Sequence, residues 1–331
     1  MENNMKIDIV IPWVDGMDPA WQEVKNEYTA SEGTDHGINR YRDWDLLKYW
    51  FRGVEKFAPW VNKIHFITWG HTPKWLNKDA DKLNIVLHQD YIPEQFLPVF
   101  SSHPIELNMH RIEGLAEQFI YFNDDMYLIR QVKPEDFFRN GLPVDTVTEV
   151  PLRFNPGGVD HIIGNDMLII NKHFSKGQVI SSNKKQWFSL KAMKSTLKNI
   201  YMKPVNGFSA FDNPHVPQAF CKNVFNQVWD KEKELLEQTS SHRFRSNEDV
   251  NQWLFRYWQF VTGQFVQVKD ISGKFFSIGR DNIAIEEAIL GQKYNTICLS
   301  DDDISLDFEE EKKSLQVLFE KILPEKSSFE L

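Results

Sequence analysis

The chain has 331 residues, of which 41% are hydrophobic and 14% aromatic, enough for one large core or two modest ones. Its net charge of −9 argues against a dedicated nucleic-acid binder, and its two cysteines, Cys221 and Cys298, lack the spacing of a zinc knuckle or a disulfide framework. The N-terminus has no signal-peptide pattern and no stretch approaches the roughly 20 apolar residues of a membrane-spanning helix, so we expect a soluble cytoplasmic protein.

Apolar strands alternate with amphipathic helices along the first part of the chain. Residues 7–14 are an uninterrupted, β-branched run typical of a buried strand, and Asp18-Pro19 then supplies an N-cap acid and a proline for the first turn of a helix. Residues 42–57 carry apolar side chains at helical spacing, and residues 63–76 repeat the order of strand, turn and Thr-Pro. Further strands are expected at 83–88, 118–123 and 296–300. This alternation predicts an α/β, Rossmann-like fold with a largely parallel sheet flanked by helices.

Three of these strands end in residues suited to binding a ligand. The first strand ends at Asp15, the second at Trp69, and the strand at 118–123 runs into Asp124 and Asp125. In open parallel sheets, ligands bind beyond the carboxyl ends of the strands. We therefore expect these residues to share one rim of the sheet.

Asp124 and Asp125 form the first candidate metal site. Adjacent carboxylates repel each other, and after a buried strand they are costly unless they are exposed or neutralised by a cation. Oxygen ligands with no Cys or His close by suit Mg²⁺ or Mn²⁺. A plain Asn-Asp-Asp turn is the alternative. Asp301-Asp302-Asp303 repeats the arrangement after another short apolar strand, where the alternative is a helix N-terminus whose dipole favours acids.

One histidine and three arginines are candidates for chemistry on a phosphate. His215 lies between two prolines that fix the local backbone, which suits a general base or a phosphate donor, although a lone His is more often structural. Arg243 and Arg245 have the i, i+2 spacing that puts both side chains on one side of an extended segment, and Arg111 is a further candidate. Each arginine could equally form a surface ion pair. Together with the acids, these residues suit chemistry on a phosphate or a nucleotide sugar.

Residues 167–211 have an unusual charge pattern, with eight lysines and no Asp or Glu. Lys184, Lys191 and Lys198 repeat every seven residues, so we expect a Lys-rich, mostly helical insertion. Its apolar helical stripe comprises Trp187, Leu190, Leu197, Ile200 and Tyr201. The lysines are either a solvated face or a surface for something anionic, such as a phosphorylated glycan, a lipid phosphate or a membrane surface. Further along, an amphipathic pattern predicts a C-terminal docking helix at 308–323.

Four blocks of the sequence, in a defined order, carry a family resemblance. They are IDIVIPWVDGMDPAW at 7–21, residues 40–76 with 100–128, NPHVPQAF at 213–220 with HRFRSNEDV at 242–250, and ICLSDDDIS at 297–305. Together they resemble the Stealth family of hexose-1-phosphate transferases, which includes bacterial capsule-polymer phosphotransferases and the animal enzyme that puts GlcNAc-1-phosphate on lysosomal glycoproteins. The blocks span nearly the whole chain, so the resemblance implies a single catalytic domain at 5–325, similar to the bacterial branch.

The resemblance implies a reaction in which an acceptor sugar hydroxyl attacks the β-phosphorus of a UDP-sugar. UMP leaves, and a sugar-1-phosphate phosphodiester forms in a capsular polysaccharide. The implied partners are the UDP-sugar donor, Mg²⁺ or Mn²⁺, and a growing glycan or lipid-linked oligosaccharide as acceptor. We expect the enzyme in the cytoplasm, peripherally at the inner face of the cell membrane. There the Lys-rich segment would contact the membrane-associated phosphoglycan.

The family's roles at the donor end map onto matched positions of this sequence. The residues expected to line the nucleotide pocket are Trp13, Val14, Asp15 and Gly16. The resemblance implies that Asn123, Asp124 and Asp125 hold the metal on the diphosphate. Asp301 and Asp302 are expected to complete this site.

The resemblance also implies the residues that would move the proton and bind the phosphate. His215 is the expected general base, unless an acid such as Asp302 takes that role. Arg245, with Arg243 or Arg111 nearby, is expected to bind phosphate and stabilise the transition state.

Two other functions remain open at this point. A metal-dependent glycosyltransferase would transfer the sugar alone and release UDP, so its product distinguishes it from a phosphotransferase. A non-catalytic nucleotide-sugar-binding assembly protein would need fewer ionisable residues at the rim.

Overall fold

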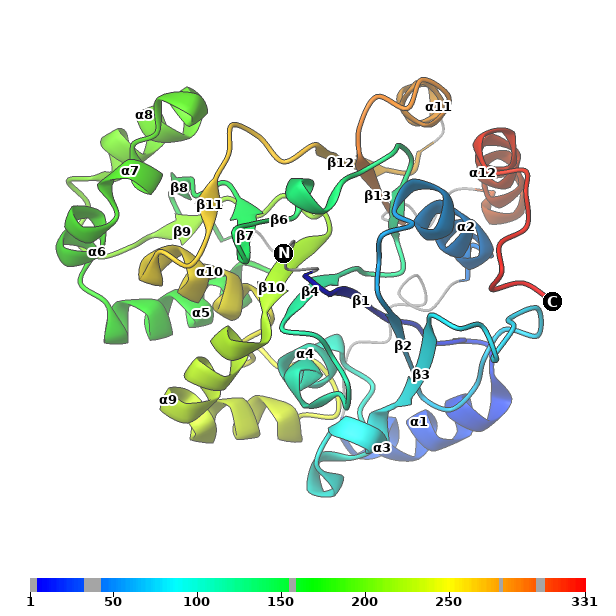
Figure 1. The fold of residues 1–331 in the computed structure, drawn as a ribbon. Helices are drawn as coiled ribbons and strands as arrows, with labels where there is room; N and C mark the ends of the chain where they lie inside the picture. The colour runs from blue at the N-terminus through cyan, green and yellow to red at the C-terminus, as the bar shows by residue number, and fades with distance from the viewer. Residues whose placement is uncertain (1–4, 33–42, 155–158, 280–281, 302–306) are drawn as a thin grey trace.

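The computed structural model describes residues 5–32, 43–154, 159–279, 282–301 and 307–331, and Figure 1 shows their arrangement. The main sheet has five strands in the order β10-β4-β1-β2-β3. Their bounds are Ile7–Pro12 (β1), Ile64–Thr68 (β2), Leu83–Leu87 (β3), Gln118–Tyr121 (β4) and Gln218–Cys221 (β10). Strands β4, β1, β2 and β3 are parallel, and β10 is antiparallel to β4. The prediction of an α/β fold with a largely parallel sheet is confirmed.

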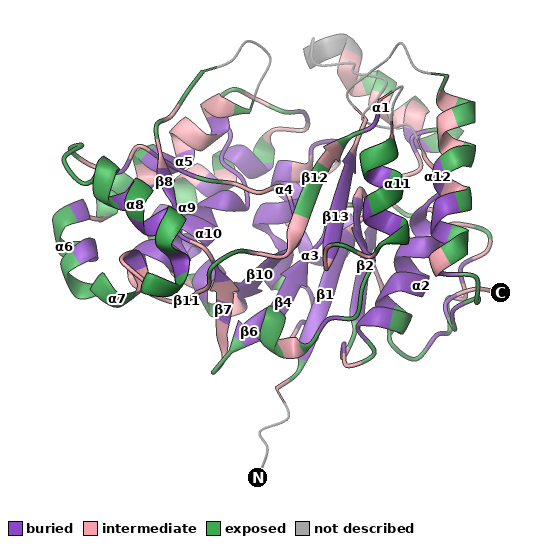
Figure 2. Cartoon of the chain, turned by 90° about the horizontal axis from the view of Figure 1, so that it is seen from above, coloured by how far each residue is buried: buried purple, intermediate pink, exposed green. Residues whose placement is uncertain are grey.

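Helices cover both faces of this sheet, with α2 and α12 above it and α4 and α9 below it in Figure 1. The helices of this part are α1 (Pro19–Glu32), α2 (Leu47–Phe57), α3 (His88–Tyr91), α4 (Ser102–Leu107), α9 (Lys222–Ser241), α10 (Trp253–Thr262), α11 (Ile283–Leu290) and α12 (Phe308–Ile322). Aromatic side chains join α2 to the sheet, where the rings of Trp50 and Phe122 meet edge to face at 5.6 Å. Figure 2 shows that strands β1, β2, β4 and β10 of this sheet are mostly buried and lie in the centre of the molecule.

A second sheet brings the fourth sequence block beside the second. It contains β12 (Gly273–Ser277), β13 (Thr296–Ser300) and β5 (Met126–Leu128) in the order β12-β13-β5. Strand β5 begins directly after Asp125 and runs antiparallel to β13. The backbone N–H of Leu299 donates to the carbonyl oxygen of Asp125 at 2.9 Å. The end of β13, with Ser300 and Asp301, therefore lies next to the acidic turn.

The Lys-rich segment is helical and forms the left-hand part of Figure 1. Its helices are α5 (Asp160–His173), α6 (Lys176–Ser182), α7 (Lys184–Trp187) and α8 (Met193–Met202). Short strands beside them are β6 (Phe138–Arg139), β7 (Leu142–Asp145) and β11 (Val266–Gln267), which form one sheet, and β8 (Glu149–Val150) and β9 (Ala210–Phe211), which form another. Of the expected apolar stripe, Trp187 is buried, whereas Leu190, Leu197, Ile200 and Tyr201 are exposed.

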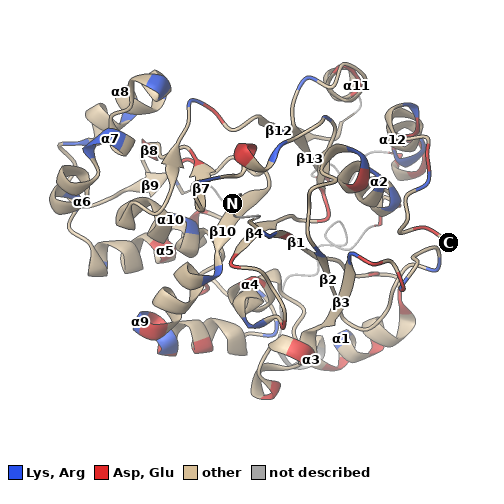
Figure 3. Cartoon of the chain, in the orientation of Figure 1, with Lys and Arg blue, Asp and Glu red and all other residues tan. Residues whose placement is uncertain are grey.

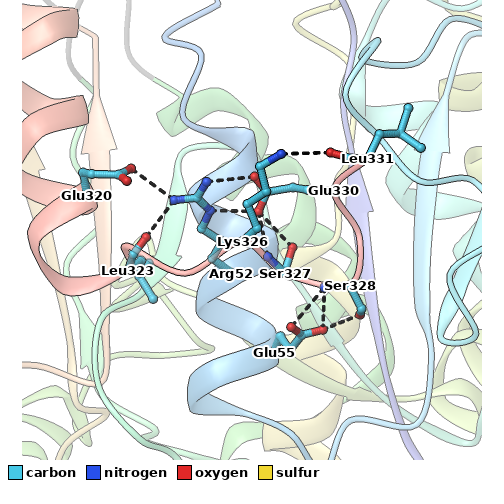
Figure 4. A network of polar contacts seen from close by, with 9 residues as sticks. All are labelled: Arg52, Glu55, Glu320, Leu323, Lys326, Ser327, Ser328, Glu330 and Leu331. Carbon is cyan, nitrogen blue, oxygen red and sulfur yellow. Dashed lines mark hydrogen bonds and ion pairs between the residues drawn. The ribbon is translucent and has the colours of Figure 1, made fainter.

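The C-terminal segment is held against α2, as Figure 4 shows. The Arg52 guanidinium donates to both carboxylate oxygens of Glu330 at 2.8 Å and to the carbonyl oxygen of Leu323 at 2.8 Å. The C-terminal residues also pack against the segment that follows β2. The strand, turn and Thr72-Pro73 pattern in this segment resembles the one before the first helix and so suggested a second helix. There Asn77 N–H donates to the carbonyl oxygen of Phe329 at 2.8 Å, and no helix forms.

None of the helices in the described part of the chain has the length and apolar character needed to span a bilayer.

Candidate active site

A cavity with a volume of about 550 Å³ opens at the carboxyl ends of the parallel strands. Trp13 and Val14 after β1, His88 after β3 and the turn at 123–125 after β4 all line it. Because β4 pairs with β1, the ends of these two strands deliver their following residues to the same place. The structure therefore brings the acidic turn and the first sequence block together at one rim, as expected.

His215 reaches this rim because β10 runs antiparallel to β4. It lies three residues before β10, so it lies beside the residues that follow β4. Its Nε2 atom is 3.5 Å from Oδ2 of Asp125 and 3.3 Å from Nδ2 of Asn123. The side chains of His215 and Asp125 are 34% and 30% exposed, so this histidine–carboxylate pair is open to a ligand in the cavity.

Arg256 in α10 holds the loop that precedes His215. Its guanidinium donates from Nη1 to the carbonyl oxygen of Asp212 at 2.9 Å and to Oδ1 of Asn213 at 2.7 Å. The same guanidinium donates to both carboxylate oxygens of Asp145, at 2.7 and 2.8 Å. Burial is the largest single influence and works to lower the pKa of Arg256, but the charge and hydrogen bonds of Asp145, together with the charges of Tyr257 and Asp212, outweigh it and raise that pKa. This buried, fully bonded pair fixes the backbone two residues before the histidine.

Asp249 organises the loop that carries Arg245. Its carboxylate lies 2.7 Å from Nδ1 of His103 and 2.6 Å from Nδ1 of His242, and it accepts the backbone N–H of Ser246 at 2.9 Å. Arg245 lines the cavity and donates from Nη2 to Oγ of Ser102 at 3.4 Å. The loop thus presents a guanidinium to the cavity from the side of α4.

The acidic turn concentrates negative charge. Asp124 is exposed at the cavity wall, yet partial desolvation by the surrounding protein, together with the charges of Asp125 and Asp43, raises its pKa to about 7. Burial also raises the pKa of Asp43, which lines the same cavity. Oδ1 of Asp125 is buried without a hydrogen-bond partner among the described residues. Crowded carboxylates and an unpartnered oxygen fit a bound cation.

The sequence expectation of acids with no Cys or His close by is wrong for the folded chain. Asp125, His215 and Cys298 offer ligand atoms within 4.8 Å of one another, and Sγ of Cys298 lies 3.2 Å from Oδ2 of Asp125. The pairing of β5 with β13 produces this proximity. The folded chain therefore offers two groups of metal ligands. One consists of carboxylate oxygens around Asp124, and the other combines Asp125, His215 and the Cys298 thiol.

Of the remaining site residues predicted from the sequence, only some line the cavity. Asp301 lines the cavity, whereas Asp302 lies outside the described residues. Gly16 and Asp15 form the turn behind Val14, where the N–H of Asp15 donates to Nε2 of His71 at 2.8 Å. Two arginines pack on aromatic rings away from the cavity lining, Arg111 at 4.5 Å from the Trp229 ring and Arg243 at 4.7 Å from the Tyr28 ring.

Glu106 and Gln252 line the cavity but were not predicted from the sequence. Glu106 is 3% exposed, and its Oε1 accepts the hydroxyl of Tyr121 at 3.1 Å. Oε2 of Glu106 and Oε1 of Gln252 have no hydrogen-bond partner among the described residues. The signal that could have found Glu106 is an acid between Ile105 and Leu107, since a carboxylate in an apolar run is costly without a partner.

Comparisons with known proteins identify the relatives of this chain. Models of conserved regions 1, 2 and 3 of Stealth proteins match residues 5–33, 40–144 and 214–261, respectively. The capsular polysaccharide phosphotransferase WcwK of Streptococcus pneumoniae is 41% identical over 100% of this chain and 99% of its own length. The receptor polysaccharide phosphotransferase WefC of Streptococcus gordonii is 42% identical over 98% and 99% of the two chains. The exopolysaccharide phosphotransferase cps2G of Lactiplantibacillus plantarum is 37% identical over 98% and 96%.

Proposed function

The chain belongs to the Stealth family and is a polysaccharide phosphotransferase, and on this premise we propose that it transfers sugar-1-phosphate from a UDP-sugar to a glycan hydroxyl. In the proposed step the acceptor oxygen bonds to the β-phosphorus, and the bond from that phosphorus to the bridging oxygen breaks. UMP leaves, and the acceptor gains a phosphodiester. The observation that carries this proposal is the pairing of His215 with Asp125 of the acidic turn inside one cavity.

His215 is the proposed general base. A neutral imidazole can take the proton of the acceptor hydroxyl, and Asp125, 3.5 Å away, would stabilise the imidazolium that forms. Arg256 acts as a positioning residue, because it holds Asn213 and Asp212 just before the histidine. Asp302, which lies outside the described residues, is the alternative base.

The proposed metal is Mg²⁺ or Mn²⁺, held by the oxygens of Asp124, Asp125 and Asp301. A divalent cation at this position would neutralise charge on the donor diphosphate. The crowded carboxylates support an oxygen-ligated ion. Cys298 is left out of the proposed set because thiolates suit Zn²⁺ and hard cations prefer oxygen.

Arg245 is the proposed phosphate ligand at the opposite wall, since a guanidinium matches phosphate oxygens and stabilises charge in the transition state. The uracil would bind near Trp13, whose ring is held by Phe66 at 5.7 Å and His71 at 5.4 Å. Val14 and Asn123 line the same region. Asp15, Gly16 and Arg243 would support the walls rather than contact the donor, and Arg111 has no part in the proposal.

Glu106 and Gln252 are proposed to recognise hydroxyls of the transferred sugar. Each offers a buried oxygen without a partner among the described residues, and a sugar hydroxyl would satisfy it. The acceptor in the proposal is a growing or lipid-linked glycan, and the enzyme acts peripherally at the inner face of the cell membrane.

One experiment separates this proposal from its rivals. Purified protein is incubated with a panel of UDP-sugars, Mg²⁺ and a glycan acceptor, and the released nucleotide is identified. UMP together with a phosphodiester product supports the proposal. UDP with a glycoside product would indicate a glycosyltransferase, and donor binding without either nucleotide would indicate an assembly protein.

A further inference from the structure

Helix α8 points three uncharged polar side chains toward the protein interior. Ser195, Thr196 and Asn199 are buried, and each has a specific hydrogen-bond partner. Ser195 Oγ accepts the hydroxyl of Thr148 at 2.7 Å, and Asn199 Oδ1 accepts the backbone N–H of Glu149 at 2.7 Å. These bonds fix which face of the helix points inward.

The outward face of the same helix is apolar. Leu197, Ile200 and Tyr201 are 59%, 52% and 78% exposed, and Met193 and the preceding Leu190 are 49% and 84% exposed. Met193, Leu197, Ile200 and Tyr201 follow the i, i+4, i+7, i+8 spacing of a single helix face. Large apolar side chains grouped on a soluble surface mark an interaction site.

Lysines surround this apolar face. Two of the eight lysines in 167–211 form ion pairs within the chain: the buried Lys176 pairs with Glu149 at 2.9 Å, and Lys172, whose side chain is 59% exposed, pairs with Glu232 at 2.6 Å. The exposed remainder are Lys184, Lys185, Lys191, Lys194, Lys198 and Lys203. No ion pair joins any of these six to another described residue. Figure 3 shows their charge along α7 and α8, at the end of the molecule away from α12.

We propose that the α8 face, defined as Leu190, Met193, Leu197, Ile200 and Tyr201 with the six exposed lysines, docks the enzyme on an anionic membrane surface. Apolar side chains enter the boundary between headgroups and acyl chains, while flanking lysines bind lipid phosphates. Protein interfaces are instead depleted in lysine, so the charge favours a lipid surface over a protein partner.

This docking would serve the proposed reaction without being part of it. Helix α5 belongs to the same helical group as α8, and Ile162 in α5 lines the cavity together with Val159 just before it. A membrane bound at α8 would therefore hold at the lipid surface the helical group that supplies this part of the cavity lining, where an acceptor glycan is carried on lipid. The cavity residues do not contribute to the α8 face.

Vesicle cosedimentation tests the proposal with the full chain. The wild type is expected to bind vesicles of phosphatidylcholine with phosphatidylglycerol, to bind pure phosphatidylcholine vesicles weakly, and to lose binding as salt is raised. The variant Lys191→Gln/Lys194→Gln/Lys198→Gln is expected to bind anionic vesicles roughly 100-fold more weakly. Leu197→Gln/Ile200→Gln is expected to lose at least about tenfold, because its apolar contacts with lipid are removed.

The matched control is Lys74→Gln/Lys78→Gln/Lys313→Gln, which removes the same charge from exposed lysines elsewhere and is expected to bind as the wild type does. Equal binding by the wild type and the Lys191/Lys194/Lys198 variant would overturn the proposal, as would no binding of the wild type to anionic vesicles. A wild-type dimer that Leu197→Gln/Ile200→Gln converts to monomer, measured by light scattering, would show instead that a second copy covers this face. Because neither readout uses turnover, failure here would leave the proposed reaction untouched.

Discussion

The Nε2 atom of His215 lies 3.5 Å from Oδ2 of Asp125, although the two residues belong to separate conserved blocks. The antiparallel pairing of β10 with β4, in which Gln218 is opposite Tyr121, brings them together. The acidic turn after β4 and the proline-flanked segment before β10 thus form one reactive corner of the cavity. This corner is the most direct place to test the proposed chemistry.

Replacing His215 by Ala should lower kcat by about 10²- to 10⁴-fold, the usual contribution of a general base, with little change in the donor KM. Asp125→Ala should also lower kcat, and the double variant should lose much less than the product of the two single losses, because the two groups act as a unit. Steady-state kinetics on all three variants measure this. Multiplicative losses would show that the two side chains act independently. Unchanged unfolding midpoints would serve as the control for folding.

Chelation should abolish activity, and Mg²⁺ or Mn²⁺ should restore it. Direct binding of Mn²⁺, measured by calorimetry or electron paramagnetic resonance, should be lost in Asp124→Ala and retained in Cys298→Ser. The reason is that hard cations take carboxylate oxygens and not the thiol. Loss of binding in Cys298→Ser with retention in Asp124→Ala would assign the ion to the mixed set of Asp125, His215 and Cys298.

Arg256→Met should destabilise the fold by about 3–5 kcal/mol, because it leaves the buried carboxylate of Asp145 without its partner. Arg256→Lys keeps the charge but loses the two-point contact, so it should be less destabilising. Both variants release Asn213 and should therefore lower kcat more than they raise the donor KM. Urea unfolding and kinetics give the two readouts. Wild-type kcat in a folded Arg256→Lys protein would argue against a positioning role.

The residues at the rim of the sheet could be predicted from the sequence, because buried parallel strands are uninterrupted apolar runs and the polar residues that follow each run mark its carboxyl end. The strand that ends before Asp124 is apolar until it reaches the cavity, so its end is visible in the sequence. The two prolines around His215 made it only a weak candidate from local sequence, and its role as the general base was implied by the family resemblance. Its place depends on β10 running antiparallel, a long-range pairing that residue spacing does not reveal.

The orientation of α8 also could not be predicted from residue spacing alone. The spacing of Leu197, Ile200 and Tyr201 predicted a helical stripe, and an apolar stripe normally faces inward. Here the inward face was decided by hydrogen bonds that Ser195 and Asn199 form with the distant segment 147–149. Glu106 was missed for a related reason, because its importance comes from an unpartnered oxygen at a cavity wall and not from its neighbours in sequence.

Acid should destabilise the protein through His110, which is 7% exposed and lies against the rings of Phe225 and Trp229. Burial, and next the charge of Arg111, lower the pKa of His110 to about 3 from the ordinary 6.5. The folded state therefore holds this histidine neutral, while the unfolded chain takes up a proton below pH 6.5. Its contribution to stability is full above pH 6.5 and is lost as the pH falls toward 3.

Between pH 7 and pH 5 this single group should lower the free energy of unfolding by about 2 kcal/mol. In His110→Gln that part of the loss should disappear, and Arg111→Gln should reduce it by less, because burial is the larger cause. Urea unfolding of the three proteins at both pH values measures the differences. An identical drop in the wild type and His110→Gln would show that another group, such as the buried His88 with its pKa of about 4, carries the acid sensitivity.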